Sequence, residues 1–361
     1  MPATCCATTA RTALSTEGLL AYCRAGFEPE LAAELGERAA AAGLHAYVRA
    51  ERDRGFVQLL GVEDGATLSR ALPWRLLVFA RQKLRLLADL PDLDPADRIT
   101  PVLEALSGRG RFGELWVEHP DSEAGKPLAG LARAFGNALR PALRRRGYLT
   151  AEPDPRLPRL HVLLVAGEHL LLGLADPDDA APWPLGIPRL RAHPEAPSRS
   201  ALKLEEALLC LLSPTEREAW LRPGMLAADL GAAPGGWSWV LARRHVRVFA
   251  IDNGAMAETA LATGIIEHLR ADGFRWQPPK PLDWMVCDMV ESPRKVAARM
   301  ATWFREGWCR RAIFNLKLPM KKRWIETRDC LALFADAAGR PLDVRARQLY
   351  HDREEITVYA G

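Results

Sequence analysis

The chain has 361 residues, of which 48% are hydrophobic and 26% are charged, and this composition is that of an ordinary soluble protein with room for two or three domains. The formal net charge is +4, and it is unevenly distributed: residues 1–196 hold 24 basic and 25 acidic residues, whereas residues 197–361 hold 25 and 20. This excess favours a polyanionic partner for the second half, or reflects a GC-rich genome biased toward Arg and Ala.

Cysteine and histidine usage excludes several classes of site. The seven cysteines are odd in number and scattered, with no C-x-x-C pair, and the eight histidines form no H-x-x-x-H set. We therefore expect reduced thiols, no metal and a cytoplasmic protein. Residues 1–17 lack an apolar core and so predict no signal peptide, with Cys5 and Cys6 in a frayed tail. No window approaches 18 consecutive apolar residues, so no membrane span is expected.

In chain order, residues 18–100 predict a small α+β unit, which we assign to a domain over 1–98. The predicted elements are a strand at 18–27, a helix at 28–43, two short strands within 45–61, a helix at 67–79 broken near Pro73, and a strand at 80–90. Strand-helix-strand-strand-helix-strand is the ferredoxin-like order. That order says little about function by itself.

A second small domain is predicted over 99–176. Its predicted elements are a helix at 99–108, a strand at 113–120, a helix at 127–147 and a hairpin at 159–175. The second helix carries five arginines and no acidic residue, namely Arg133, Arg140, Arg144, Arg145 and Arg146. These arginines form either a solvated helix face with a basic end that suits the helix dipole, or an edge that contacts RNA phosphates.

The remainder of the chain predicts a linker and a doubly wound α/β domain. Proline-rich residues 177–197 read as the linker. The domain over 198–361 opens with a helix at 200–212, and five apolar runs follow, at 225–230, 247–252, 264–272, 282–288 and 311–317. Residues 348–360 close it as a hairpin. Alternating strands and helices with two final antiparallel strands are typical of S-adenosylmethionine enzymes with a Rossmann-like fold.

Residues 229–242, DLGAAPGGWSWVLA, read as a strand end, a glycine turn and the start of a helix. Glycines there let the backbone approach a ligand closely. Asp252 ends the next apolar run, 21 residues beyond Gly231, where a carboxylate can accept both ribose hydroxyls of an adenosine-type cofactor. Because the order is G-x-x-x-G-G, the dinucleotide fingerprint is not met, and the residues alone predict a nucleoside-cofactor site with the cofactor open.

Two lysines and two carboxylates are predicted to meet beside this turn. Asp288 and Lys317 end apolar runs, Glu354 and Glu355 open the final strand, and Lys203 lies on the preceding helix. Such a set suits proton removal from a hydroxyl, because a lysine next to a second lysine and partly buried has a lowered pKa and can act as a base. Structural ion pairs explain the same spacing equally well.

Five segments, DLGAAPGGWS, SRSALKLEEA, CDMVESP, NLKLPMKKRW and LYHDREEITV, resemble the FtsJ-like ribose methyltransferases, in particular the bacterial 23S ribosomal RNA cytidine 2′-O-ribose methyltransferases of subunit M type. The likeness extends over nearly the whole chain, including that family's ferredoxin-like and THUMP regions. It implies the cofactor S-adenosyl-L-methionine, a 23S ribosomal RNA substrate and a monomeric enzyme. The fold class implied is α/β, with a Rossmann-like methyltransferase domain preceded by α+β ferredoxin-like and THUMP domains.

The resemblance also implies roles for individual residues. The family's tetrad corresponds to Lys203, Asp288, Lys317 and Glu355, with Lys317 as proton acceptor, Lys203 lowering its pKa and Asp288 orienting it. Glu354 is adjacent and is the alternative glutamate, but the likeness of EITVYA to the family's closing strand favours Glu355. The implied cofactor positions are Ser200, Ala233, Pro234, Gly235, Gly236, Asp252, Asp272 and Asp288. Asp272 is expected at the adenine amine, and Lys321, Lys322, Arg323 and Trp324 are expected to form a basic loop with an aromatic beside the RNA, or simply to open the next helix.

Three other functions compete for these residues. A base methyltransferase would carry an N-P-P-Y-like loop or a nucleophilic cysteine after a proline, whereas Cys287 here precedes Asp288 and suits a buried apolar position. A nicotinamide oxidoreductase would carry G-x-G-x-x-G. A non-catalytic RNA-binding module would keep the basic helix and have no need of the four tetrad residues together.

Overall fold

The computed structural model describes residues 17–361, so the predictions made for the first 16 residues, including Cys5 and Cys6, lie outside the described part. The chain divides into two compact units. The first runs to Ala21 and includes Leu35–Leu72 and Lys83–Ala180, and the second comprises Tyr22–Glu34, Pro73–Gln82 and Ala181–Gly361. The second unit therefore recruits two short segments from the region predicted as the first domain.

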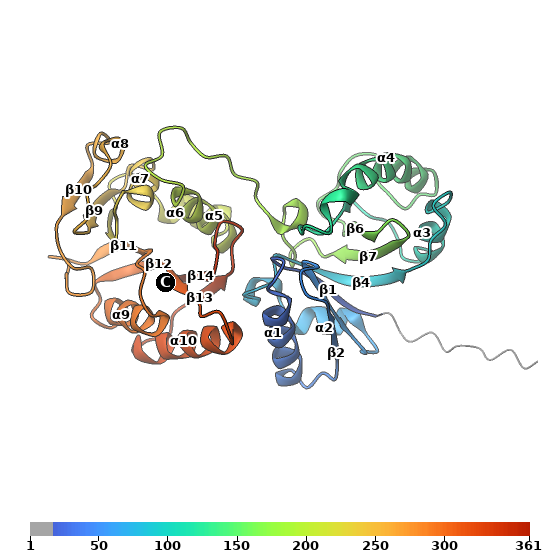
Figure 1. The fold of residues 1–361 in the computed structure, drawn as a ribbon, viewed down its shortest axis with the longest axis horizontal. Helices are drawn as coiled ribbons and strands as arrows, with labels where there is room; N and C mark the ends of the chain where they lie inside the picture. Colours follow the sequence, from blue (N-terminus) through green and yellow to red (C-terminus); the bar gives the residue numbers. More distant parts are fainter. Residues whose placement is uncertain (1–16) are drawn as a thin grey trace, which may run out of the picture. The chain divides into compact units, whose positions relative to one another are not determined.

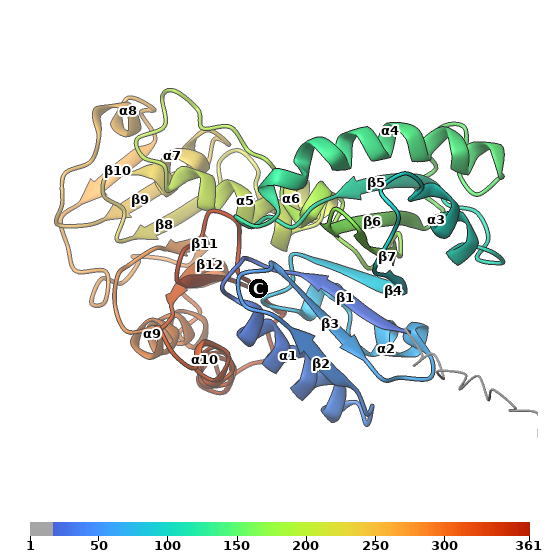
Figure 2. The same cartoon turned by 45° about the vertical axis from the view of Figure 1, so that its right-hand side comes forward.

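The N-terminal half contains a seven-stranded sheet of order β2-β3-β1-β4-β7-β6-β5. Its strands are β1 (Gly18–Tyr22), β2 (Tyr47–Ala50), β3 (Phe56–Leu60), β4 (Gln82–Leu90), β5 (Glu114–Glu118), β6 (Arg159–Ala166) and β7 (His169–Ala175). The first four have the ferredoxin-like order. Because β4 pairs antiparallel with β7, strands from both predicted N-terminal domains form one sheet, which is visible in Figure 2.

Helices and short 3₁₀ turns accompany this sheet among the residues that the structure describes. They are α1 (Glu28–Ala41), α2 (Gly65–Ala71), α3 (Ile99–Ala105), α4 (Ala129–Arg145), η1 (Trp74–Leu76), η2 (Lys126–Leu128) and η3 (Pro184–Gly186). In α4, Ala132, Phe135, Leu139 and Leu143 recur every three or four residues, and all are buried in the core of the first unit. This spacing orients one face of α4 to the core and leaves its basic face outside.

The second unit is built on a second seven-stranded sheet, of order β10-β9-β8-β11-β12-β14-β13. Its strands are β8 (Leu226–Leu230), β9 (Arg247–Ile251), β10 (Ile266–Leu269), β11 (Leu282–Cys287), β12 (Cys309–Lys317), β13 (Val344–Arg347) and β14 (Glu355–Ala360). Strands β8 to β12 are parallel, and β14 is antiparallel to both β12 and β13. The predicted closing hairpin exists, but its first strand ends at Arg347, before the predicted start at residue 348.

Helices cover both faces of this sheet. They are α5 (Ala201–Leu211), α6 (Pro214–Trp220), α7 (Gly236–Ala242), α8 (Glu258–Leu261), α9 (Pro293–Arg305) and α10 (Arg323–Ala337). Helices α5 and α7 lie on one face, and α9 and α10 lie on the other (Figure 1). Coverage of both faces explains why β8 and β11 are mostly apolar and buried along their length instead of alternating regularly between apolar and polar residues.

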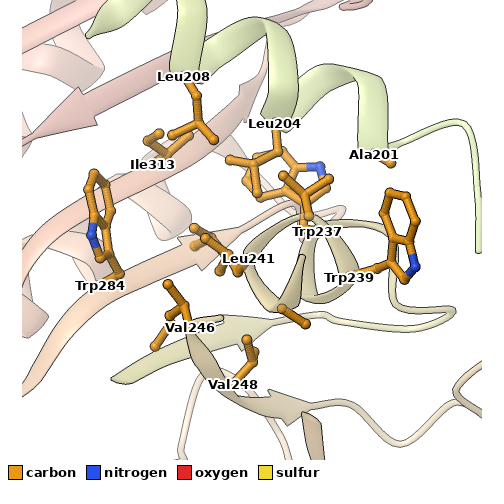
Figure 3. Close-up of a cluster of buried hydrophobic side chains, with 14 of the residues drawn as sticks. Ala201, Leu204, Leu208, Trp237, Trp239, Leu241, Val246, Val248, Trp284 and Ile313 are labelled. Carbon is orange, nitrogen blue, oxygen red and sulfur yellow. The ribbon is translucent and has the colours of Figure 1, made fainter. Parts of the chain in front are cut away.

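The core under α5 and α7 fixes the elements that carry the candidate site. Leu204 and Leu208 of α5 and Trp237 of α7 converge on Trp284 and Ile313 of the sheet (Figure 3). All five side chains are almost completely buried, and packing at this density resists displacement of one element against another. The start of α5, the glycine turn before α7 and the carboxyl ends of β11 and β12 are therefore held in fixed positions.

The structure also bears on metal ligands, cysteines and membrane-spanning helices. Among residues 17–361, no group of three or more His, Cys, Asp or Glu side chains is arranged to hold a metal ion. Cys23, Cys210, Cys287, Cys309 and Cys330 are free thiols. Within the same range, the helices are too short or too polar for any of them to traverse a lipid bilayer.

Candidate active site

The strand order of the second sheet changes direction at β8, whose neighbours are β9 and β11. In open α/β sheets ligands bind beyond the carboxyl ends of the strands at such a switch point. A recess of about 240 Å³ lies there, lined by Ser198, Ser200, Asp229, Gly231, Ala232, Ala233, Pro234, Trp237 and Asp288. The glycine turn predicted from the sequence therefore borders a real cavity.

The backbone of this turn is shaped for close approach. Gly231 and Gly235 have φ angles of 77° and 110°, in the region that side chains rarely adopt. A Cβ on Gly235 would lie 2.7 Å from Cβ of Ala260, and one on Gly236 would collide with the hydroxyls of Ser198 and Ser200. The turn thus has no room for side chains, and its backbone lines a cavity large enough for part of a nucleoside.

Two carboxylates lie near the turn, as the sequence predicts. Asp252 follows β9, and its two oxygens accept hydrogen bonds from the amides of Ala233 (3.0 Å) and Gly254 (2.7 Å), which fixes the carboxylate beside the turn. Asp272 is half-exposed and forms a 3.6 Å ion pair with Arg275. Its neighbour Gly273 lies against Gly231, so Asp272 is also close to the turn.

Of the predicted cofactor residues, Ser200, Ala233, Pro234 and Asp288 line the recess, whereas Gly235, Gly236, Asp252 and Asp272 lie around it. Four lining side chains were not predicted, namely Ser198, Asp229, Ala232 and Trp237. Asp229 is the first residue of the glycine motif. Its position at the strand end before the glycine turn is the sequence signal that could have identified it as a lining residue. Its buried carboxylate accepts a 2.7 Å hydrogen bond from Ser238, and burial raises the pKa of Asp229 to about 7 despite that bond.

The four tetrad residues form a closed ring of alternating charge. Lys203 Nζ lies 3.3 Å from Asp288 Oδ2 and 2.5 Å from Glu355 Oε1. Lys317 Nζ lies 2.6 Å from Asp288 Oδ1 and contacts Glu355 Oε2. All four side chains are at least three-quarters buried, so each charge is screened little by solvent and is neutralised by its neighbours.

The strand register explains why the ring closes. Lys317 ends β12 and is the direct antiparallel partner of Glu355, which opens β14, so the two side chains leave the sheet on the same face. Asp288 immediately follows β11, the neighbour of β12 on its other side. Lys203 reaches the ring from the first turn of α5. Three adjacent strand ends and one helix therefore deliver the four groups.

The charges of the ring set the pKa values of its members. Burial disfavours the charged form of Asp288, but the two lysines outweigh it and lower the pKa of Asp288. Burial likewise lowers the pKa of Lys317, but Asp288 and Glu355 together outweigh it and raise the pKa of Lys317 above its ordinary value. The predicted lowered pKa of Lys317 is therefore wrong for this arrangement, because two carboxylates act on it at close range.

The residues around the ring resolve two open points. Glu354 is half-exposed and binds Arg323 at 2.6 Å, so Glu355 is the glutamate in the ring. Arg323 is itself mostly buried against Phe27 and Glu30 of the same unit. Trp324 is 7% exposed, so the predicted exposed aromatic of this loop is wrong: the tryptophan packs into the unit, while the exposed positions are Met320, Lys321 and Lys322.

The cavity beside the glycine turn yields a first test. Gly235→Ala is expected to weaken S-adenosylmethionine binding about 5- to 150-fold, because its Cβ would collide with Ala260 and Met256 and the turn must then shift away from the cofactor, a distortion that costs about 1–3 kcal/mol. Calorimetric titration of the variant with the cofactor measures this loss. Gly264→Ala is the matched control, since Gly264 has φ 73° but nothing within 4 Å of a Cβ. Equal affinities in both variants would contradict the assignment of the turn.

Comparison with known proteins matches three successive stretches of the chain to family models. Residues 16–84 match the RlmM ferredoxin-like domain, residues 97–176 match the N-terminal domain of ribosomal RNA large subunit methyltransferase M, and residues 196–303 match the FtsJ-like methyltransferase family. The chain is 68% identical to the ribosomal RNA large subunit methyltransferase M of Xanthomonas campestris pv. campestris (strain B100), over 95% of this chain and 99% of that protein. The protein of the same name from Stenotrophomonas maltophilia (strain R551-3) is also 68% identical, over 95% and 97%.

The doubly wound sheet, its glycine turn and the FtsJ-like match define an S-adenosylmethionine-dependent methyltransferase. Sequence identity of 68% over nearly the full length of both chains then identifies one family within this class of methyltransferases. The chain belongs to the ribosomal RNA large subunit methyltransferase M family. The resemblance and the fold class inferred from the sequence are thereby confirmed, whereas the domain boundaries and the roles of individual residues stay predictions.

Proposed function

We propose that the protein methylates the ribose 2′-hydroxyl of a cytidine in 23S ribosomal RNA, using S-adenosylmethionine and Lys317 as general base. The proposal rests on the position of Asp288 between the recess and the base. Asp288 lines the recess, and its carboxylate accepts a hydrogen bond from Lys317 at 2.6 Å. A base in the ring is thus adjacent to the place where a methyl donor fits. A non-catalytic RNA-binding module would not need this buried charged ring.

The recess fits S-adenosylmethionine, with the glycine turn and Ser200 along the cofactor, Asp252 at its ribose and Asp272 at its adenine. When bound, this cofactor supplies an electrophilic methyl group on a sulfonium. The protein must then hold the RNA hydroxyl in line with that methyl group, and alignment of reactants contributes roughly 7–11 kcal/mol. Asp288 anchors this alignment because it borders the recess and binds both lysines.

Lys317 would take the proton of the 2′-hydroxyl as its neutral amine. At neutral pH the raised pKa keeps most of this lysine protonated, so only a small fraction of the protein holds the active base. General base catalysis contributes about 10²- to 10⁴-fold. Glu355 and Asp288 receive the hydrogen bonds of the ammonium formed, while Lys203 balances their charge and is available to the incoming RNA.

We further propose that the exposed arginines of α4 and the exposed lysines 321 and 322 contact RNA phosphates, and that the protein acts as a cytoplasmic monomer. Arg140 and Arg144 donate hydrogen bonds to backbone carbonyls of Leu115, Thr150 and Ala151, so they serve the fold. Arg133, Arg145 and, directly after α4, Arg146 are also exposed, and these fit a polyanion.

The substrate is tested in a strain that lacks the gene. Ribose methylation is mapped across its 23S ribosomal RNA, and the purified protein is then supplied with that RNA and S-adenosylmethionine. The proposal predicts that one cytidine loses its 2′-O-methyl group in the strain and regains it in the reaction. A map identical to that of the parent strain, or a methyl group restored on a base, would contradict the proposal.

The RNA surface yields a second test. The double variant Arg145→Ala/Arg146→Ala is expected to weaken RNA binding and to reduce the slope of log affinity against log salt by about 1.4–1.8, the value for two lost phosphate contacts. Cofactor affinity should not change. The pair Arg52→Ala/Arg54→Ala, at the β2–β3 turn, removes the same charge elsewhere on the unit and should leave the slope intact. Equal slopes for all three proteins would remove this role from α4.

A further inference from the structure

A line of buried polar side chains runs from the ring into the interior of the second unit, to which the ring itself belongs. Asn315 Nδ2 donates to Asp288 Oδ1 at 2.9 Å, and Asn315 Oδ1 lies 2.8 Å from the hydroxyl of Thr357. That hydroxyl in turn lies 3.1 and 3.3 Å from the two carboxyl oxygens of Asp352. Asn315 and Thr357 are completely buried and Asp352 is 1% exposed, so bulk solvent does not reach their hydrogen bonds.

The pairing register of β12 and β14 places this line of polar side chains next to the ring. Asn315 and Thr357 are direct partners on β12 and β14, as Lys317 and Glu355 are two residues further along. Residues two apart on a strand share one face, so a neutral polar pair lies directly behind the charged pair. A slip of one residue between β12 and β14 would disperse both pairs at once.

The number of available hydrogen-bond protons determines which group donates and which accepts at each step of the line. The Asp288 carboxylate, which binds two lysines, can only accept, so Asn315 must present its amide hydrogens to it and its carbonyl to Thr357. The one hydroxyl proton of Thr357 is then used on Asn315. The contact between Thr357 and Asp352 is satisfied only if Asp352 carries a proton and donates it to the hydroxyl oxygen, because two lone pairs would otherwise face each other in a buried site.

The surroundings of Asp352 agree with a neutral carboxyl group. Its Oδ2 accepts the amide hydrogen of Leu349 at 2.9 Å, which leaves Oδ1 for the proton. Glu206 fixes the turn before it by accepting hydrogen bonds from the amides of Tyr350 and His351. The ionisable groups that act on Asp352 are Glu355 and Glu206, which disfavour its charge, and Lys203, which favours it; burial is the largest influence, and the pKa of Asp352 is raised well above its usual range.

We propose that Asn315, Thr357 and a neutral Asp352 are positioning residues, which form a proton-ordered chain that holds the Asp288 carboxylate with Oδ1 on Lys317 and Oδ2 on Lys203. Without the chain, Asn315 is free to turn its carbonyl toward Asp288, which repels that carboxylate and displaces both lysines. This inference rests on the proposed function, because it assigns to the chain the geometry of the base and of the residue that borders the recess.

Thr357→Val tests the chain, since valine keeps the shape but donates no hydrogen bond to Asn315. We expect kcat on ribosomal RNA to fall about 10- to 100-fold, the usual effect of losing a partner that orients an active group, while cofactor affinity stays unchanged. The acid limb of the kcat profile, which follows the deprotonation of Lys317, should move to lower pH, because Lys317 faces Asp288 and Glu355 and the displaced Asp288 carboxylate no longer raises its pKa as strongly. Thr357→Ser restores the donor and should recover most of kcat.

Asp352 supplies an independent comparison that does not depend on how Thr357→Val folds. Asp352→Asn reproduces a donor for Thr357 and an acceptor for Leu349, whereas Asp352→Leu provides neither. We expect the asparagine variant to retain at least about tenfold more activity than the leucine variant. Equal losses in the two Asp352 variants would overturn the proposal, as would a Thr357→Val enzyme with the kcat and acid limb of the unmodified protein.

Two measurements separate this proposal from the proposed function and from a purely structural role. If the unmodified protein transfers no methyl group to a ribose hydroxyl, the proposed function itself is wrong. If it does so and only the Thr357 and Asp352 predictions fail, the chain has no positioning role. Thermal unfolding of each variant is recorded in parallel, and a lower Tm without any movement of the acid limb would show that Thr357 serves the fold alone and would overturn the proposal.

Discussion

Lys317→Ala is expected to reduce kcat for methyl transfer to ribosomal RNA by about 10²- to 10⁴-fold, while S-adenosylmethionine binding persists. The magnitude is that of a lost general base. Cofactor binding should survive because Lys317 does not line the recess, whereas Asp288, which does, keeps Lys203 as a partner at 3.3 Å. Single-turnover methylation with radiolabelled cofactor measures the chemical step, and calorimetric titration measures the affinity.

The control for this variant is Lys280→Ala, which removes the same charge at an exposed position before β11. It should leave both kcat and cofactor affinity unaltered. A Lys317→Ala protein with a kcat close to that of the unmodified protein would show that another group takes the proton, and the general base would have to be sought elsewhere in the ring. Loss of cofactor binding would instead indicate that the ring organises the recess.

Much of the site was predictable because parallel strands end on one edge of a sheet. Asp288 and Lys317 follow apolar runs that could only be central strands, and the glycine turn follows another. Their meeting at one crevice then required no knowledge of distances. The structure decides between Glu354 and Glu355, for which the resemblance favoured Glu355: Glu354 lies outside β14, whereas Glu355 opens that strand and pairs with Lys317 of β12.

Other features depend on tertiary contacts that leave no local pattern. Asn315 and Thr357 are ordinary polar residues 42 positions apart, and only the pairing of β12 with β14 makes them partners. Trp324 follows three basic residues in sequence, yet it packs near Phe79, with the two ring centroids 6.3 Å apart. The pKa of Lys317 is a balance between burial and two carboxylates, and the sign of such a balance follows from distances that spacing does not supply.

Glu355→Gln is expected to shift the pH dependence of catalysis and to lower the free energy of unfolding by about 3 kcal/mol, the cost of removing one partner from a buried ion pair. The active base is the neutral amine of Lys317, so kcat of the unmodified protein should rise about tenfold per pH unit below the pKa of that lysine, which lies above its ordinary value of 10.5. Removing Glu355 takes away one of the two carboxylates that raise this pKa, and burial opposes the other. The variant should therefore reach its plateau at a lower pH.

The stability of the two proteins must follow the same titration. A lysine with a raised pKa in the folded state contributes stability that is complete below the pKa of the unfolded chain and is lost as the pH rises through the folded pKa. The difference in unfolding free energy between the unmodified protein and Glu355→Gln should accordingly be largest at neutral pH and shrink in the alkaline range. Glu354→Gln is the matched control, since Glu354 binds Arg323 outside the ring. It should not change the pH profile of kcat, and its effect on the unfolding free energy should not vary with pH in the alkaline range. If kcat of Glu355→Gln and of the unmodified protein reaches its plateau at the same pH, the carboxylate does not act on the base.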